Sequence, residues 1–336
     1  MITKQIVFTA PGIAELLEKE IPAPAAGEVQ VEIAVSSISS GTERANLNGD
    51  VNISVSKTYK EVIFPRTLGY SSAGTVIAVG EGVTHLKVGD RVALSWSKHQ
   101  RYINMQQSKV FLLPDNVSFE TAALFHIAIF PLAAIRKCRL ELGESAIVMG
   151  QGILGQIAVP LLRSAGAAPI IAVDPVPEKR ARALELGADY ALDPYAPDFA
   201  ETAKALTNGG ANVAIEVTGV GKALDGVLDC MKKMGRVALL GCTRNSDFTI
   251  DYYHKVHGPG ISLIGAHTMA RPDHDSSNGL WTQTDDMNAL IKLTACGRLD
   301  LGAMVEETHS YTEAAEVFGR LSREPQFPIV QFDWRD

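Results

Sequence analysis

The stretch Ile147-Val-Met-Gly-Gln-Gly-Ile-Leu-Gly-Gln156 determines how the rest of the sequence is interpreted. Its glycines at 150, 152 and 155 have the spacing G-x-G-x-x-G. A short apolar run precedes them and a helical pattern follows, so the motif connects a predicted strand to a predicted helix. In that context the first glycine permits a tight turn and the second lets a pyrophosphate approach the backbone. The third lets the helix pack closely on the strand.

The ligand expected at this loop is a dinucleotide, with its phosphates facing the N–H groups at the start of the helix. The loop residues expected to bind it are Gly150, Gln151, Gly152, Ile153, Leu154 and Gly155. A second predicted strand, residues 169–174, ends in Asp174. A carboxylate there can accept hydrogen bonds from both adenosine ribose hydroxyls and would repel a 2′-phosphate, so NAD is expected rather than NADP.

Length and composition limit the possible classes of protein. A chain of 336 residues with 46% hydrophobic and 21% charged residues suits two globular domains. The formal charge of −7 leaves no basic stripe for nucleic acid or an anionic membrane surface. No apolar segment reaches the roughly 18 residues of a transmembrane helix, and the N-terminus lacks a signal-peptide pattern. The four cysteines form no C-x-x-C pair, so we expect reduced thiols, a cytoplasmic location and no structural zinc.

The order of predicted elements indicates an α/β chain with two kinds of sheet. Residues 1–117 are β-rich, and the run 28–35 alternates polar and apolar side chains as a strand with one solvated face does. From 146 to 266, strands and helices alternate, which favours a six-stranded, doubly wound parallel sheet. One of its helices is predicted over 222–234, followed by a strand over 235–241. The tail from 287 on contains two amphipathic helices and a strand, and is expected to rejoin the β-rich domain.

Several motifs then identify a family. Leu68-Gly-Tyr-Ser-Ser-Ala-Gly-Thr-Val-Ile-Ala-Val-Gly-Glu-Gly-Val83, the turn Val88-Gly-Asp-Arg-Val92, the glycine loop and the run 235–241 resemble the medium-chain dehydrogenase/reductase superfamily. This resemblance implies a GroES-like catalytic domain over 1–126, a Rossmann NAD-binding domain over 127–267 and a return to the catalytic domain over 268–336. It also implies a homodimer or homotetramer.

The chain departs from the zinc-dependent branch of that family at its metal ligands. That branch has Cys-Gly-Thr-Asp and Gly-His-Glu where this chain has Ser40-Gly-Thr-Glu43 and Gly69-Tyr-Ser71. Hydroxyl and phenol groups are poor zinc ligands, since zinc prefers thiolate, imidazole or carboxylate. We therefore expect no catalytic zinc. This version resembles the zinc-less subgroup that contains bacteriochlorophyllide 2-hydroxyethyl dehydrogenase and sugar-cluster oxidoreductases.

Without zinc, protein groups must take the hydroxyl proton and stabilise the developing alkoxide. Tyr70, which replaces a ligand histidine, is the first candidate, although it could equally fill the vacated metal cavity. Thr42 matches the proton-relay hydroxyl of the family, and His126 lies one residue from the expected third ligand, with a satisfied helix histidine as its alternative. Further candidates are Ser40 and Glu43, the latter as a base or as structural support. Substrate contacts are expected from Ser71, from His99 (otherwise a surface strand residue) and from Trp281, a possible stacking surface.

The remaining cofactor contacts are expected where strands end at the carboxyl edge of the parallel sheet. These residues are Val217, Thr218, Leu240, Gly241, Cys242, Ala266 and His267. Together the observations predict a zinc-independent, NAD-dependent oxidoreductase for a secondary alcohol or ketone of a small-molecule sugar, glycoside or polyol. The alternatives are a tetrapyrrole hydroxyethyl dehydrogenase, a zinc-free quinone or enoyl reductase, and a non-catalytic NAD-binding protein.

Overall fold

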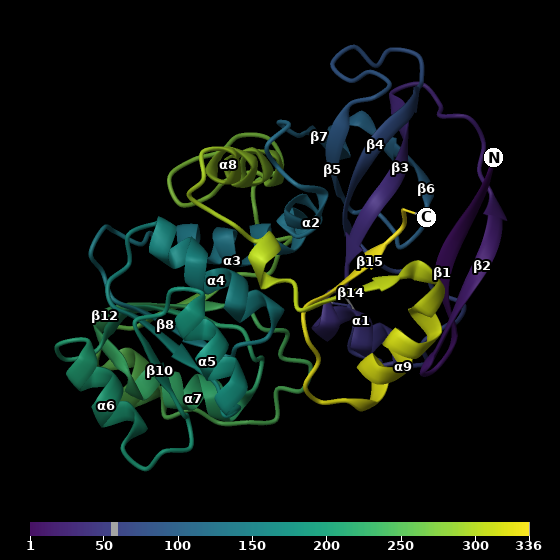
Figure 1. Ribbon diagram of the computed structural model, residues 1–336. Coiled ribbons are helices and arrows are strands. Elements are labelled where there is room, and N and C mark those ends of the chain that lie inside the picture. The colour runs from purple at the N-terminus through teal and green to yellow at the C-terminus, as the bar shows by residue number, and fades with distance from the viewer. Residues whose placement is uncertain (55–59, 336) are drawn as a thin grey trace. The chain divides into compact units, whose positions relative to one another are not determined.

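The computed structural model describes residues 1–54 and 60–335. The chain divides into two units (Figure 1). The first unit contains Met1–Ile127 and Met287–Asp336, and the second contains Ala128–Asp286. The first boundary lies one residue from the expected position, whereas the chain returns to the first unit at 287 and not at 268.

The second unit is built on a six-stranded parallel sheet with the strand order β10-β9-β8-β11-β12-β13. Its strands are β8 (Ala146–Met149), β9 (Ile170–Val173), β10 (Tyr190–Leu192), β11 (Ala211–Glu216), β12 (Met231–Leu239) and β13 (Ser262–Gly265). Its helices are α4 (Ile153–Ser164), α5 (Pro177–Glu185), α6 (Phe199–Leu206), α7 (Gly221–Asp229) and the short π-helix η2 (Tyr253–His257). This arrangement confirms the predicted doubly wound fold.

Burial of the central strands explains why their sequences are continuous apolar runs. Every residue of β8 and β9 is buried, because helices cover parallel sheets on both faces. Helices α4 and α5 pack on β8, β9 and β10, while α7 packs on β8, β11 and β12.

The predicted boundary between the helix over 222–234 and the following strand was wrong. The segment 231–234 is strand and not helix, because α7 ends at Asp229 and Met231 pairs with Ala211.

The first unit combines a seven-stranded sheet with a separate hairpin. The sheet order is β14-β15-β3-β4-β5-β7, and β6 also pairs with β3. The strands are β1 (Ile2–Ala10), β2 (Ile13–Glu20), β3 (Glu28–Ser37), β4 (Ser71–Val79), β5 (Arg91–Ser95), β6 (Tyr102–Gln106), β7 (Val110–Leu112), β14 (Glu307–Ser310) and β15 (Val330–Asp333). The helices are α1 (Ser40–Leu47), α2 (Phe119–Ala122), α9 (Ala314–Arg323) and the 3-10 turns η1 (Gln107–Lys109), η3 (Gly302–Met304) and η4 (Tyr311–Glu313). Two helices cross the unit boundaries: α3 (Phe125–Lys137) and α8 (Gln283–Ala295).

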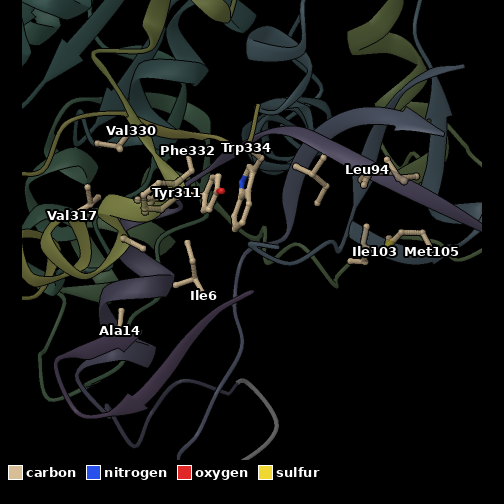
Figure 2. Close-up of a cluster of buried hydrophobic side chains, with 14 of the residues drawn as sticks. Ile6, Ala14, Leu94, Ile103, Met105, Tyr311, Val317, Val330, Phe332 and Trp334 are labelled. Carbon is tan, nitrogen blue, oxygen red and sulfur yellow. The ribbon is translucent and has the colours of Figure 1, made fainter. Parts of the chain in front are cut away.

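The core of the first unit joins the start and the end of the chain. Strand β15 pairs with β3, and α9 packs on β2 (Figure 1). In this core the rings of Tyr311 and Trp334 stack with their centroids 4.9 Å apart (Figure 2). The tail therefore rejoins the β-rich unit, as expected.

Two sequence expectations about solvent exposure and boundaries need correction. Strand β3 has no solvated face, because every residue from Glu28 to Ser37 is buried or half-buried, and Gln30 is only 5% exposed. The segment 268–286 stays with the second unit because Asp286, which is 0% exposed, pairs with Arg136 of α3 and with Arg271.

Across the described ranges, no helix combines the length and apolar character needed to cross a bilayer.

A surface ion cluster on β14 predicts a pH window of stability. Glu307 accepts hydrogen bonds from Arg320 at 2.8 and 3.1 Å and pairs with His309 at 2.8 Å. The Arg320 guanidinium, followed by His309, lowers the pKa of Glu307 from 4.5 to about 2, against the effect of burial. Glu307 in turn raises the pKa of His309 above 6.5.

The depressed Glu307 pKa contributes stability above about pH 4.5 that is lost as the pH falls towards 2. The raised His309 pKa contributes stability below about pH 6.5 that is lost as the pH rises through the folded-state value. We therefore expect Glu307→Gln to lower the melting temperature most between about pH 4.5 and 6.5. The exposed Glu316→Gln on α9 is the control, and thermal unfolding at several pH values is the measurement. An equal effect of Glu307→Gln at every pH from 2 to 8 would contradict this.

Candidate active site

The glycine loop between β8 and α4 has the close packing that its sequence predicts. A Cβ atom on Gly155 would lie 1.9 Å from the Gly150 carbonyl oxygen, so no larger residue fits there. At Gly152, the N-cap of α4, an added Cβ would meet no atom within 4 Å. The loop therefore has open space above the helix N-terminus, where phosphate oxygens can accept backbone hydrogen bonds.

Asp174 follows β9 and is 6% exposed. One carboxylate oxygen accepts from the Gln151 N–H at 2.8 Å and the other accepts from the Val176 N–H at 2.9 Å. Each carboxylate oxygen has a further lone pair, so these bonds orient the group and leave capacity for ligand hydroxyls. Arg180 donates to the Asp174 backbone carbonyl at 2.8 Å, so its guanidinium holds the backbone at Asp174.

The end of β11 is fixed by a buried carboxylate. Burial raises the pKa of Glu216, and hydrogen bonds from Thr218 and Gly219 oppose that shift. The turn 217–219 is thereby held against the end of β12, where a Cβ on Gly241 would lie 2.2 Å from the Gly219 nitrogen. Leu240 is buried and Cys242 is exposed beside this turn.

A cavity of about 310 Å³ lies at the carboxyl ends of β8, β9 and β11. It is large enough for an adenosine-sized group. Asp174 and Thr218 line it, as do Tyr195 and Lys222, whose ammonium lies 5.0 Å from the Tyr195 ring centroid. Sequence analysis did not select Tyr195 or Lys222, because neither belongs to the glycine motif. The residues present therefore fit a dinucleotide.

Other residues expected at the cofactor or substrate lie elsewhere in the second unit. Ala266 is buried after β13, and His267 follows it, accepting from the Met269 N–H at 3.2 Å. Burial and Lys137 lower the pKa of His267, which favours a neutral imidazole. The Trp281 ring lies 3.5 Å from the Arg136 guanidinium, so this stacking surface already holds a cation of its own unit.

Tyr70 lies in the first unit immediately before β4. Its hydroxyl donates to the Ser39 hydroxyl, at the residue that precedes α1. The Trp96 N–H donates to the Tyr70 carbonyl at 2.9 Å, and the His99 N–H donates to the Leu68 carbonyl at 2.9 Å. These bonds fix the backbone around Tyr70. Gly69 is required between them, because its φ is 92° and an added Cβ would lie 2.6 Å from the His99 nitrogen.

Two further rings surround Tyr70. His126 lies edge-on at 5.4 Å between ring centroids, and Trp96 lies at 5.9 Å. The Trp96 and His126 rings are 4.6 Å apart. His126 is 0% exposed and its Nδ1 lies 2.6 Å from the Ser95 hydroxyl, so it is a buried wall of the site and is not open to solvent. Trp96 is 38% exposed and has a φ of 63°, a costly conformation for a bulky residue.

A buried hydrogen-bonded chain lies behind Tyr70 and Ser39. One Glu43 oxygen accepts from the Ser39 N–H at 2.9 Å, and the other lies 2.9 Å from the His99 Nε2. His99 Nδ1 lies 2.8 Å from the Ser36 hydroxyl, which accepts from the Trp334 indole N–H at 2.9 Å. Glu43 is 0% and His99 is 1% exposed. Both residues therefore support other groups, and the expectations of a surface or substrate-contacting His99 were wrong.

The remaining hydroxyl candidates differ in accessibility. Ser71 is 1% exposed and donates to the Ala123 carbonyl at 2.6 Å, so the structure contradicts a substrate contact for it. Ser40 and Thr42 are half-buried in the first turn of α1. Sequence analysis missed Ser39 and Trp96, because no family motif contains them and only the fold brings them to Tyr70.

The donors at the expected metal position do not fit zinc. Tyr70 is bonded to Ser39, Ser71 is bonded to a backbone carbonyl, and Ser40 provides an alcohol. None of these three is a thiolate, imidazole or carboxylate, the donors that zinc prefers. Within residues 1–54 and 60–335, no three His, Cys, Asp or Glu side chains lie together in a way that could hold a metal ion.

Two family models match this chain. Residues 25–117 match the alcohol dehydrogenase GroES-like domain, and residues 154–280 match the zinc-binding dehydrogenase domain. (R,R)-butanediol dehydrogenase of Bacillus subtilis is 33% identical over 231 residues, which cover 60% of this chain and 66% of that protein. D-guloside 3-dehydrogenase of Escherichia coli is 26% identical over 336 residues, with 94% and 95% coverage.

The fold has also been seen in solved structures. An alcohol dehydrogenase from Escherichia coli, crystallised with NADH, superposes with a TM-score of 0.82 at 17% identity, covering 99% of each chain. With the order of domains, the glycine loop and the two matched models, the chain belongs to the medium-chain, zinc-type alcohol dehydrogenase superfamily and is an oxidoreductase.

Proposed function

We propose that this chain is an NAD-dependent dehydrogenase that interconverts a secondary alcohol and its ketone without a catalytic metal. The observation that carries this proposal is the hydrogen bond between Tyr70 and Ser39 at the position where relatives are expected to hold zinc. Zinc would act there as a Lewis acid on the substrate oxygen. The hydroxyl groups of Tyr70 and Ser39, beside the rings of Trp96 and the buried His126, provide proton transfer and hydrogen bonding instead.

The preference for NAD rests on Asp174. NAD supplies the acceptor for the substrate hydride, and the glycine loop and Asp174 are the residues that would hold its phosphates and ribose. The Asp174 carboxylate is fixed by two backbone N–H groups and has capacity for ribose hydroxyls. The same negative charge disfavours a 2′-phosphate.

Tyr70 and Ser39 handle the hydroxyl proton. For alcohol oxidation Tyr70 first loses its phenol proton to solvent, and the phenolate then accepts the proton of the substrate hydroxyl. During ketone reduction the phenol donates its proton to the carbonyl oxygen and regains one from solvent. A serine hydroxyl rotates and can either donate or accept. Ser39 therefore stabilises both protonation states of Tyr70, since it accepts from the phenol and can donate to the phenolate.

A polyhydroxylated substrate suits the polar, half-buried hydroxyls near Tyr70. Ser40 and Thr42 lie in the first turn of α1, next in sequence to Ser39. Among relatives, one acts on a D-guloside and another on a butanediol, and both names describe compounds with neighbouring hydroxyls. We therefore propose a sugar, glycoside or polyol as substrate.

The function is tested by NADH formation with chelator-treated protein, NAD and a panel of sugars, glycosides and polyols. We expect turnover that survives chelation and does not increase with added zinc. Activity only after zinc addition would contradict the metal-free site. NADH binding without turnover, across the panel and a hydroxyethyl tetrapyrrole, would favour a non-catalytic dinucleotide-binding protein.

Removing the Tyr70 hydroxyl tests its part in the chemistry. We expect Tyr70→Phe to lower kcat by about 10²- to 10⁴-fold, the range for loss of a general acid–base group. NADH affinity and melting temperature should stay close to those of the wild type, because the ring is retained. Tyr102→Phe on β6 is the matched control. Unchanged kcat in Tyr70→Phe would mean that the residue only fills the cavity.

The glycine loop offers a paired test of cofactor binding. At Gly152 the backbone has a φ of −75°, so alanine fits the fold, but its Cβ enters the open space above α4. We expect Gly152→Ala to weaken NADH binding at least tenfold with little change in melting temperature. Gly155→Ala should destabilise the second unit by roughly 1–3 kcal/mol, because its Cβ overlaps the Gly150 carbonyl. NADH fluorescence titration and thermal unfolding measure both effects, and normal NADH affinity in Gly152→Ala would contradict phosphate binding there.

A further inference from the structure

The start of α1 is capped in an unusual way. Ser39 is its N-cap residue, and a serine there ordinarily accepts a hydrogen bond from a backbone N–H of the first helical turn. The Ser39 side chain makes no such bond. Glu43, one turn into the helix, reaches back and accepts from the Ser39 N–H at 2.9 Å. Glu43 is the fourth helical residue, so this contact resembles the carboxylate half of a capping box, which ordinarily comes from the third helical residue.

Because the Ser39 side chain does not cap α1, its hydroxyl can be directed elsewhere. A serine oxygen that caps its helix is directed at the backbone, whereas the Ser39 oxygen is directed at Tyr70 and accepts from the phenol. Glu43 holds the Ser39 backbone nitrogen, and the carboxylate is favoured near the positive end of the helix. The position of the Ser39 hydroxyl therefore depends on Glu43.

His99 fixes Glu43 in turn. A carboxylate that is 0% exposed must be surrounded by donors, and the second Glu43 oxygen has the His99 Nε2 at 2.9 Å. At the far end of this chain of contacts, the indole N–H of Trp334 (Figure 2) donates to the Ser36 hydroxyl at 2.9 Å. The Ser36 hydroxyl also lies 2.8 Å from His99 Nδ1, and a neutral His99 whose Nδ1 accepts from Ser36 has its proton on Nε2, facing Glu43.

We propose that Glu43 and His99 are positioning residues that hold the Ser39 hydroxyl against Tyr70. Neither residue is exposed to a substrate, so both act through Ser39. Their effect on turnover rests on the proposed function of Tyr70, while their effect on the environment of the Tyr70 phenol does not. This difference allows the two proposals to be tested separately.

The primary experiment is fluorine NMR of the full chain labelled with 3-fluorotyrosine. The protein has eight tyrosines, and the Tyr70 resonance is assigned by its absence in Tyr70→Phe. His99→Leu removes the donor to Glu43 and keeps a similar volume, and His99→Gln restores an amide donor. Gln331→Met is the control, because Gln331 is buried on β15 and bonds the Ser37 hydroxyl and the Glu120 carbonyl, outside this chain of contacts.

We expect the Tyr70 resonance to shift in His99→Leu, to return towards its wild-type position in His99→Gln, and to stay unchanged in Gln331→Met. An unchanged resonance in a folded His99→Leu would overturn the proposal. So would an equal shift in Gln331→Met, which would indicate a general response of the core. If His99→Leu does not fold, Glu43→Gln replaces it, because Glu43 uses a separate oxygen for Ser39 and for His99, and glutamine has an amino group in place of one of them.

Kinetics with a substrate found in the panel add a second readout. Misplacing a reacting group by about 1 Å can cost about 10²-fold in rate. We expect His99→Leu to lower kcat about tenfold to hundredfold, with KM and NADH affinity within about twofold of wild type, and His99→Gln to recover most of that loss. A change in KM alone would overturn the positioning role. A shifted Tyr70 resonance in a chain without turnover would support the positioning role and reject the dehydrogenase function.

Discussion

The carboxylate of Glu43 imposes the strongest constraint on the first unit. A carboxyl group with no solvent exposure is costly unless it is hydrogen-bonded. The Ser39 N–H and His99 satisfy it, and His99 requires Ser36 and Trp334 behind it. The hydrogen bonds that satisfy one buried carboxyl group thus link the first turn of α1, strand β3 and the end of the chain.

That arrangement explains why the last residues of the chain return to the first unit. Trp334 follows β15, which pairs with β3, and its ring stacks on Tyr311 (Figure 2). Its indole N–H reaches Ser36 on β3. Trp334 therefore both packs its ring in the core and donates a hydrogen bond to Ser36. The candidate active site thus depends on residues near both ends of the sequence.

The sequence predicted the parts of this protein that depend on local pattern. The glycine loop, the six-stranded sheet and Asp174 could be predicted, because strand, turn and helix follow one another within a few residues and each has its own periodicity. The role of Ser39 could not be predicted, since it depends on Glu43 taking over the helix cap and on residues 68–70 pairing with 96–99. His99 was misplaced at the surface for the same reason. Its burial comes from strands that are distant in sequence, so a short polar run around it indicated exposure.

In the proposed metal-free site, hydroxyl groups take the place of metal ligands, which changes the requirements on the surrounding protein. A zinc ion fixes its ligands through its own coordination geometry, whereas a phenol and a serine hydroxyl have several rotamers. Rigidity must then come from packing, and the surroundings of Tyr70 provide it. Trp96 adopts a left-handed backbone conformation that costs about 1–3 kcal/mol. In return its N–H holds the Tyr70 carbonyl, and its ring closes one side of the site together with the buried His126. The strained backbone at Trp96 and the burial of the polar Glu43 side chain are each unfavourable taken alone. Both hold the hydroxyls of Tyr70 and Ser39 in one geometry. Because two unfavourable features both fix the Tyr70 and Ser39 hydroxyls, we infer that these hydroxyls do more than fill space.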